Sequence, residues 1–330
     1  MRIDEGTCLK TAELIKAVHL RKSFYERPFL QVSAPDEIRL RGYFYAVAMC
    51  HQTYHLHHKL LNLYGWDYLE HVFIRLMQEQ DGLLHPGALA KMPVSILHDK
   101  LAILFSIDGS MEASTLDRLD ERAGMLIELD NFVEERFHGK LEKLVSETNW
   151  KLHNQGNGFY EFLPSLTAFA DPLRKKITFL LKLLEEAGIM TILDPENIVP
   201  IMDYHMQRVL LRMGCVEIED EALHYKLENR YPLADDVQIR KTCIDAFSLI
   251  ASNSGHPVTK LNDFFWSLGR SCCNEKPLCQ EGYCEKEPCT FFEIVDIEEH
   301  TTCFFMSCCK GYSNEKYRCL WQPMVETNYY

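Results

Sequence analysis

One short segment, residues 200–214, combines a carboxylate with a row of cationic side chains. Its opening proline and closing glycine are typical of the two ends of a helix, so we expect a helix of about four turns. Asp203 falls in or just before the first turn, where free N–H groups and the helix dipole stabilise an ionised carboxylate. Spacings of three and four place the cationic side chains on one face: His205, Arg208 and Arg212. This face suits a phosphate; the alternative is a capping aspartate with solvated arginines.

The cysteines are concentrated late in the chain, where nine of the 13 lie between Cys272 and Cys319. Without a secretory signal, this clustering favours metal ligation, with disulfides and unpaired thiols as the alternatives. The candidate ligands are Cys272 (or Cys273), Cys279, Cys284 and Cys289, with six (or five), four and four residues between them. The later cysteines could complete this site or form a second one: Cys303, Cys308, Cys309 and Cys319. Thiolates bind iron–sulfur clusters and zinc alike.

Histidines in the segment 51–58 form a second group of candidates. Three of them stand at i, i+4 and i+7: His51, His55 and His58. This spacing follows the apolar residues of a predicted helix over residues 35–64. Such histidines could line a core or a pocket, recognise a base by stacking and hydrogen bonding, or hold a metal. Trp66, just after the predicted helix, is a further candidate for base recognition.

The helix that follows Asp203 resembles a signature of the helix-hairpin-helix base-excision glycosylases. In that superfamily a Val-Asp-Thr-His type sequence begins a helix that carries Arg-Val and a closing glycine. The corresponding residues here read Asp203-Tyr-His205-Met-Gln-Arg208-Val, with Gly214 at the end. Residues 175–183 are similar to the lysine-rich helix of archaeal-type 8-oxoguanine DNA glycosylases. The same helices are similar to the queuosine 5′-phosphate N-glycosylases, and the resemblance covers about residues 171–270.

The resemblance implies a fold, a catalytic residue and a cofactor. It implies an all-α chain with a helix-hairpin-helix glycosylase-like core, and Asp203 is the position that matches the catalytic aspartate. Several members carry a [4Fe–4S] loop just after the last domain helix, opened by the same six-residue gap as Cys272 and Cys279. A [4Fe–4S] cluster is therefore the implied cofactor, with zinc as the alternative. The Gly-rich hairpin that grips a DNA phosphate in classical members is not visible; residues 186–193 stand near its place.

The chemistry of N-glycosidic hydrolysis explains why Asp203 is a candidate catalytic residue. Bond breaking develops positive charge on the sugar, so a fixed carboxylate nearby stabilises the oxocarbenium-like transition state. The same carboxylate can orient or deprotonate the attacking water. A desolvated, neutral lysine could instead attack the sugar and form a Schiff base, for which Lys182 and then Lys175 are candidates. Glu186, four residues after Lys182, is also typical of an ordinary surface pair.

We therefore expect an N-glycosidase that releases a modified purine from DNA. The residues expected to act in catalysis are Asp203 and Lys182. The substrate-binding candidates are His205, Arg208, His55 and Trp66. The alternatives are a hydrolase of a free modified nucleotide of the queuosine-salvage type, and a non-catalytic binding protein stabilised by its metal.

The amino-acid composition limits the kinds of partner that the chain can bind. The 35 Lys and Arg against 48 Asp and Glu give a net charge of −13, which excludes a protein that coats nucleic acid non-specifically. No window approaches the run of about 18 apolar residues that a membrane span requires. The polar N-terminus lacks the apolar stretch of a signal peptide. We expect an intracellular protein, cytoplasmic or nuclear, that acts on nucleic acid or a modified nucleotide and has no membrane partner; no protein partner can be inferred.

The pattern of apolar residues and caps predicts helices almost throughout the first 270 residues. The expected helices cover residues 11–21, 35–64, 66–80, 94–105, 114–134, 171–187, 200–213, 235–251 and 258–268. No interval alternates with period two, so a sheet of any size is not expected. We divide the chain into a helical N-terminal region (1–150), a glycosylase-like core (151–270) and a Cys-rich metal-binding module (271–330).

Overall fold

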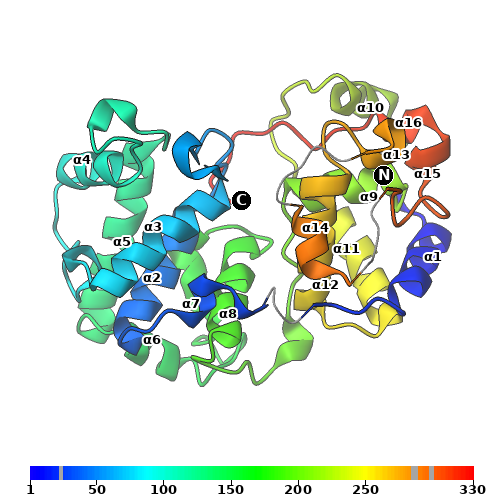
Figure 1. Ribbon diagram of the computed structural model, residues 1–330. Helices are drawn as coiled ribbons and strands as arrows, with labels where there is room; N and C mark the ends of the chain where they lie inside the picture. Colours follow the sequence, from blue (N-terminus) through cyan, green and yellow to red (C-terminus); the bar gives the residue numbers. More distant parts are fainter. Residues whose placement is uncertain (22–24, 284–288, 297–300) are drawn as a thin grey trace. The chain divides into compact units, whose positions relative to one another are not determined.

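The computed structural model describes residues 1–21, 25–283, 289–296 and 301–330. It is 58% helical and 4% strand, which confirms the all-α class. The ribbon consists mostly of helices joined by loops (Figure 1). Over the described residues the strands form only two small antiparallel pairs. One joins β1 (Arg2–Ile3) to β4 (Val216–Glu217), and the other joins β2 (His57–His58) to β3 (Leu63–Tyr64). In the described part of the chain, no helix has the length and apolar character to cross a bilayer.

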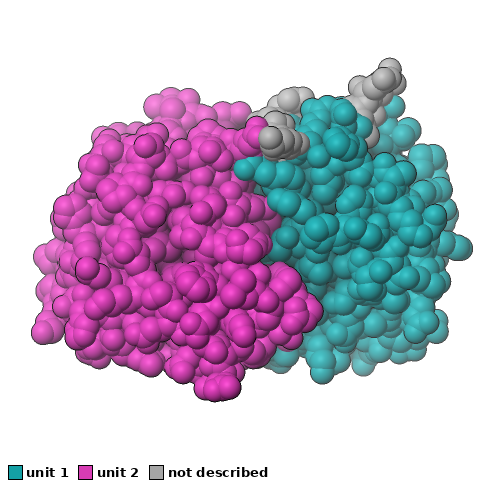
Figure 2. All heavy atoms as spheres, turned by 90° about the horizontal axis from the view of Figure 1, so that it is seen from below, with its two compact units in different colours: residues 1–25, 199–326 teal, residues 26–198, 327–330 magenta. Residues whose placement is uncertain are grey.

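The chain forms two compact units, drawn in two colours in Figure 2. Unit 1 comprises residues 1–25 and 199–326, and unit 2 comprises residues 26–198 and 327–330. Residues 151–198, which we expected in a glycosylase-like core, are grouped with the preceding helices. The Cys-rich residues up to 326 are grouped with the helices that begin after residue 199.

Unit 2 is built around one buried helix, α2. Its helices are α2 (Asp36–Ala48), α3 (Trp66–Glu79), α4 (Val94–Leu104), α5 (Leu119–Phe137), α6 (Leu141–Glu147), α7 (Phe159–Phe162) and α8 (Lys175–Glu186). Helix α2 packs against α3, α5, α6 and α8, and every residue from Leu40 to Ala48 is buried. Gly42 leaves room for the side chain of Met77 of α3, which a Cβ atom at this position would displace.

Unit 1 is arranged around α9 (Tyr204–Met213). Its other helices are α1 (Glu5–Ile15), α10 (Glu221–Glu228), α11 (Val237–Ser254), α12 (Val258–Ser267), the π-helical segment η9 (Leu268–Cys272), α13 (Leu278–Glu281), α14 (Thr290–Ile294), α15 (Lys310–Ser313) and α16 (Glu315–Arg318). Helix α9 contacts α11, α12, η9, α15 and α16, so both the regular helices and the Cys-rich segment pack on it.

The prediction of one helix over residues 35–64 is wrong. Helix α2 ends at Ala48, and the chain then turns into the β2–β3 hairpin. Arg122 of α5 donates to the backbone carbonyls of Met49 and His51, which therefore need no helical partner. This tertiary contact overrides the apolar periodicity. Two other helices also begin elsewhere than expected, since α1 starts at Glu5 and α5 starts at Leu119.

A buried ion pair joins two helices of unit 2. Arg41 of α2 and Asp130 of α5 are both fully buried and form a salt bridge. The second carboxylate oxygen of Asp130 accepts from the backbone N–H groups of Leu89 (2.8 Å) and Ala90 (2.9 Å). Asp130 thus ties α2, α5 and the loop before α4 together.

We predict that Asp130→Ala lowers the free energy of unfolding by about 3–5 kcal/mol, because it leaves the Arg41 guanidinium buried without its counter-charge. Urea denaturation measures this value. Asp120→Ala on the same helix is the matched control, because the Asp120 side chain is 78% exposed and pairs only at the surface with His98. Its cost should stay below about 1 kcal/mol. Equal costs for the two variants would contradict a structural role for the buried pair.

Candidate functional site

Asp203 caps the helix α9, as the sequence predicts. Its carboxylate Oδ1 accepts a hydrogen bond of 3.0 Å from the backbone N–H of Met206, and the residue is 9% exposed. The segment before it is held by Asn262 of α12, whose side-chain amide bonds both to the N–H (3.2 Å) and to the carbonyl (2.9 Å) of Ile201. The carboxylate is therefore fixed in orientation at the positive end of a helix.

His205 lies beside Asp203 on the first turn of α9. Its ring contacts the ring of Tyr204 (4.3 Å between centroids) and lies edge-on to Trp266 (6.4 Å). Its Nδ1 atom is 3.1 Å from a guanidinium nitrogen of Arg208. The structure therefore brings Asp203, His205 and Arg208 onto one helix as expected.

The arginines of α9 face the protein interior. Arg208 is buried and donates to the carbonyl oxygens of Cys273 (2.9 Å) and Gly269 (2.7 Å) and to the side chain of Gln322. Arg212 donates to the carbonyl oxygens of Leu320 (2.9 Å) and Asn274 (2.8 Å). Burial lowers the pKa of Arg208 to about 10, so the guanidinium keeps its charge near neutral pH.

Both guanidinium groups also lie over the ring of Trp321, at 4.6 Å for Arg208 and 5.3 Å for Arg212. A stripe that we expected to meet a phosphate thus binds the backbone of the Cys-rich segment instead. Guanidinium groups exposed to solvent along this face would have indicated a phosphate site. The aromatic Trp321 in the C-terminal segment is the sequence signal for the arrangement found, since tryptophan often stacks on arginine.

The other residues predicted for catalysis and substrate binding lie in unit 2. Lys182 of α8 is buried, at 2% exposure, and forms a 2.8 Å ion pair with Glu186, so the pair is not at the surface. The indole of Trp66 donates to Glu70 (2.7 Å) and packs on Phe179 of α8, with 4.8 Å between ring centroids. His55 is exposed. Trp66 therefore belongs to the packing between α3 and α8.

The three histidines do not share a helix face. His51 is fully buried, His55 is exposed, and His58 lies in β2 with its ring edge-on to Tyr68 (5.3 Å). The expectation of a single stripe fails because the helix that would carry it ends at Ala48. Within the described ranges, no three His, Cys, Asp or Glu side chains lie close enough to hold one metal ion.

A cavity in unit 1 is lined by cysteines. They come from η9, from α13 and from the stretch before α15: Cys272, Cys273, Cys279, Cys303 and Cys309. The sequence predicted Cys272 and Cys279 as ligands, and both line this cavity. Cys289 is the residue before α14 and is not among the lining residues, whereas Cys284 lies outside the described residues. None of the described cysteines forms a disulfide.

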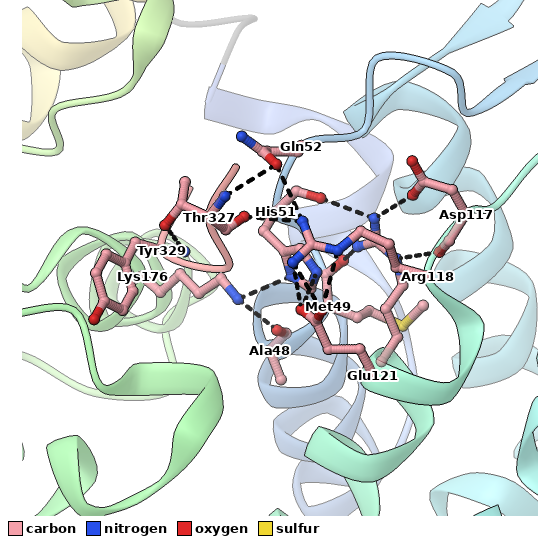
Figure 3. A network of polar contacts seen from close by, with 11 residues as sticks. Ala48, Met49, His51, Gln52, Asp117, Arg118, Glu121, Lys176, Thr327 and Tyr329 are labelled. Atoms are coloured by element: carbon pink, nitrogen blue, oxygen red, sulfur yellow. Dashed lines mark hydrogen bonds and ion pairs between the residues drawn. The ribbon is translucent and has the colours of Figure 1, made fainter. Parts of the chain in front are cut away.

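Unit 2 contains a buried polar network that we did not predict from the sequence (Figure 3). Lys176 of α8 is fully buried and donates to the carbonyl oxygen of Ala48 (2.6 Å) and to Nδ1 of His51 (3.2 Å). The other ring nitrogen of His51 lies 3.1 Å from the carboxylate of Glu121. Arg118 links this region to the last residues of the chain through the carbonyl oxygen of Thr327 (3.0 Å). The signal was present, because Lys176 lies on the apolar face of α8, four residues before Leu180.

Burial sets the protonation of this network. Burial lowers the pKa of Lys176 to about 7, and burial together with the nearby charge of Lys176 holds the pKa of His51 far below its usual value. The imidazole is therefore neutral and accepts from the lysine. Because Lys176 is closed off from solvent, the network serves to hold α8 against the end of α2.

A scan of protein-family models finds no match to the chain, and a search of curated proteins finds no significant match either. The resemblance to helix-hairpin-helix glycosylases therefore stays a prediction, based on the residues around Asp203.

We predict that Lys176 makes stability rise with pH above about 7. Above its folded pKa the buried amine loses its proton, while the unfolded chain keeps its proton up to the ordinary value of 10.5. The unfolded state then binds more protons, so stability increases by about 1.4 kcal/mol per pH unit within this window. Urea unfolding at pH 6.5 to pH 9.5, roughly the range that separates the two values, measures the slope.

Lys176→Met should remove this increment, whereas Lys143→Met, at an exposed position of α6 in the same unit, should retain it. A slope shared by the wild type and Lys176→Met would mean that the amine is not the titrating group.

Proposed function

We propose that the protein is an N-glycosidase that hydrolyses the bond between a modified purine and its sugar, with Asp203 as the catalytic carboxylate. The observation that carries this proposal is the position of Asp203. Its carboxylate is largely buried, in a residue that is 9% exposed, and it is fixed by the N–H of Met206 at the start of α9, on the helix that resembles the catalytic helix of known glycosylases.

The position suits the charge that develops in the reaction. The sugar becomes cationic as the base leaves, and a preorganised anion lowers the energy of that state without reorganising. A helix N-terminus favours the ionised form of the carboxylate. Asn262 keeps the residues before Asp203 in place, so the carboxylate is presented from a rigid backbone. Oxygen Oδ1 is directed to the helix N–H group, and the carboxylate as a whole can orient a water molecule.

Water, rather than a lysine, is the nucleophile in this proposal. The ion pair of Lys182 with Glu186 favours the charged ammonium, and only a neutral amine attacks a sugar carbon. We therefore expect no Schiff-base intermediate. Borohydride added during turnover should trap no covalent adduct between the protein and its substrate; a trapped adduct that disappears in Lys182→Ala would restore the lysine mechanism.

Two observations favour a free modified nucleotide over DNA as the substrate. The net charge is −13, and Arg208 and Arg212 bind backbone carbonyls of the protein itself. The helix that carries Asp203 therefore contributes no free guanidinium to a row of DNA phosphates. A nucleotide with one phosphate needs fewer cationic partners, which fits this balance of charge.

We predict that Asp203→Asn lowers the rate of base release by about 100-fold or more, because the charge that stabilises the cationic sugar is lost. The measurement is single-turnover release of base from free modified purine nucleotides and from duplex oligonucleotides that contain a modified purine. Asparagine caps a helix as well as aspartate does, so the fold of α9 is preserved.

Asp220→Asn is the matched control, because Asp220 caps α10 through the N–H of Leu223 (2.8 Å) in the same way. This variant should release base at the wild-type rate. Retained turnover in Asp203→Asn would remove this carboxylate from the mechanism. Binding to duplex DNA across a salt series separates the substrates, since a DNA enzyme shows a steep negative slope of log affinity against log salt.

A further inference from the structure

The single cysteine of unit 2 lies against a buried lysine. Cys50 follows the end of α2, and its sulfur accepts a hydrogen bond of 3.9 Å from the ammonium of Lys175, the first residue of α8. The two residues are 8% and 7% exposed. The pair therefore joins two segments that are 125 residues apart in the chain, at a place that is nearly closed to solvent.

Helix α8 carries three buried lysines, and Lys175 differs from the other two in its partner. Lys182 pairs with Glu186 (2.8 Å), and Lys176 belongs to the network of Figure 3. Over the described residues, the ammonium of Lys175 forms no ion pair with a carboxylate, and the sulfur of Cys50 is its hydrogen-bond acceptor. An ammonium removed from water requires a counter-charge, so this geometry favours the thiolate form of the cysteine. The thiolate is the nucleophilic form.

The backbone on both sides of Cys50 is held by other helices of unit 2. Arg122 of α5 donates to the carbonyl oxygens of the residues immediately before and after it. Lys176 of α8 donates to the carbonyl oxygen two residues before it (2.6 Å). Because this backbone is fixed, the sulfur keeps its position facing the first turn of α8.

The lysine is held from its own side as well. The backbone N–H of Lys175 donates to the carboxylate of Asp171 (2.9 Å), which fixes the start of α8. Helices α2 and α8 also pack directly on each other. Only the flexible four-carbon side chain of the lysine has to move for its nitrogen to reach the sulfur.

Unit 2 contains no second thiol with which Cys50 could react. Cys50 is the only cysteine among residues 26–198 and 327–330, so a disulfide cannot form within this unit. A cysteine that has been oxidised to a sulfenic acid condenses either with a thiol or with a nitrogen. The amine of Lys175 therefore lies where a redox-sensing protein places its second thiol.

We propose that hydrogen peroxide converts Cys50 and Lys175 into a covalent sulfur–nitrogen cross-link. The thiolate attacks one oxygen of the peroxide, the O–O bond breaks, and a sulfenic acid and a hydroxide ion are formed. The buried ammonium has then lost its counter-charge, so desolvation favours transfer of its proton to the hydroxide. The neutral amine attacks the sulfur, an S–N bond replaces the S–O bond, and water leaves. The sulfur gives up two electrons to the peroxide, and the net products are the sulfenamide and two water molecules.

The cross-link attaches α8 covalently to the loop that follows α2. In the reduced protein the same two elements are joined by the hydrogen bond from Lys176 to the carbonyl oxygen of Ala48 (Figure 3). Oxidation thus adds a covalent bond to an existing contact within unit 2. The site is independent of Asp203, which belongs to unit 1, and of the reaction proposed for it.

The first test is a peptide map of the full chain after treatment with hydrogen peroxide. Digestion and mass spectrometry should find the peptides of Cys50 and Lys175 joined, with their summed mass reduced by two hydrogen atoms. Dithiothreitol should separate them and restore the thiol and the amine. The proposal is overturned if Cys50 is oxidised without this joined pair, or if it stays reduced at a peroxide concentration that oxidises the exposed methionines.

The second test separates the two chemical steps. Lys175→Arg keeps a positive charge beside the sulfur, but a guanidinium does not lose its proton and cannot condense with a sulfenic acid. This variant should lose the joined peptides and accumulate the sulfenic acid at Cys50. Dimedone, added together with urea so that it reaches the buried sulfur, should label Cys50 in the peroxide-treated variant and not in the treated wild type.

Lys182→Arg is the matched control, because it makes the same substitution at a buried lysine of the same helix that has a carboxylate partner. It should keep the joined peptides. A cross-link at Cys50 that persists in Lys175→Arg would contradict the assignment of the nitrogen. Circular dichroism checks the fold of both variants, and if Lys175→Arg does not fold, the peptide map of the wild type still decides whether the bond forms.

Discussion

The two arginines of α9 impose the strongest constraint on unit 1. The N–H groups of a guanidinium removed from water must find hydrogen-bond acceptors, because an unpaired buried charge costs about 3–5 kcal/mol. Here the acceptors are carbonyl oxygens of η9 and of the loops that follow it, together with the ring of Trp321. The helix and the Cys-rich segment therefore stabilise each other, because the buried arginines of the helix find most of their hydrogen-bond acceptors in that segment.

This mutual dependence connects the two candidate sites of unit 1. The first turn of α9 presents Asp203, and the later turns line the cysteine cavity. A rigid helix transmits the position of one end to the other, so whatever orders the cysteines also sets the orientation of the carboxylate. An occupant of the cavity would thus act on Asp203 through the backbone of α9 rather than by contact.

The sequence predicted the helices whose signals are local. Helices α3, α4, α9 and α11 lie within a few residues of their expected bounds, because capping residues and apolar spacing are read within the helix itself. The helix over residues 35–64 was wrong, because Arg122 from another helix satisfies the carbonyls at its end. The inward direction of Arg208 and the grouping of Cys273 with Cys303 depend on packing between distant segments, which spacing in the sequence does not encode.

The order of the chain has a consequence for how the protein is made. Residues 26–198, the bulk of unit 2, are inserted between α1 and the remainder of unit 1. Helix α1 packs on α11, and Asp4 reaches Lys310, with 2.5 Å between the charged atoms. During synthesis α11 and Lys310 emerge long after α1. Helix α1 therefore lacks these contacts while unit 2 folds. Bringing the ends of so long a segment together costs conformational entropy, so unit 1 should be the slower of the two to fold.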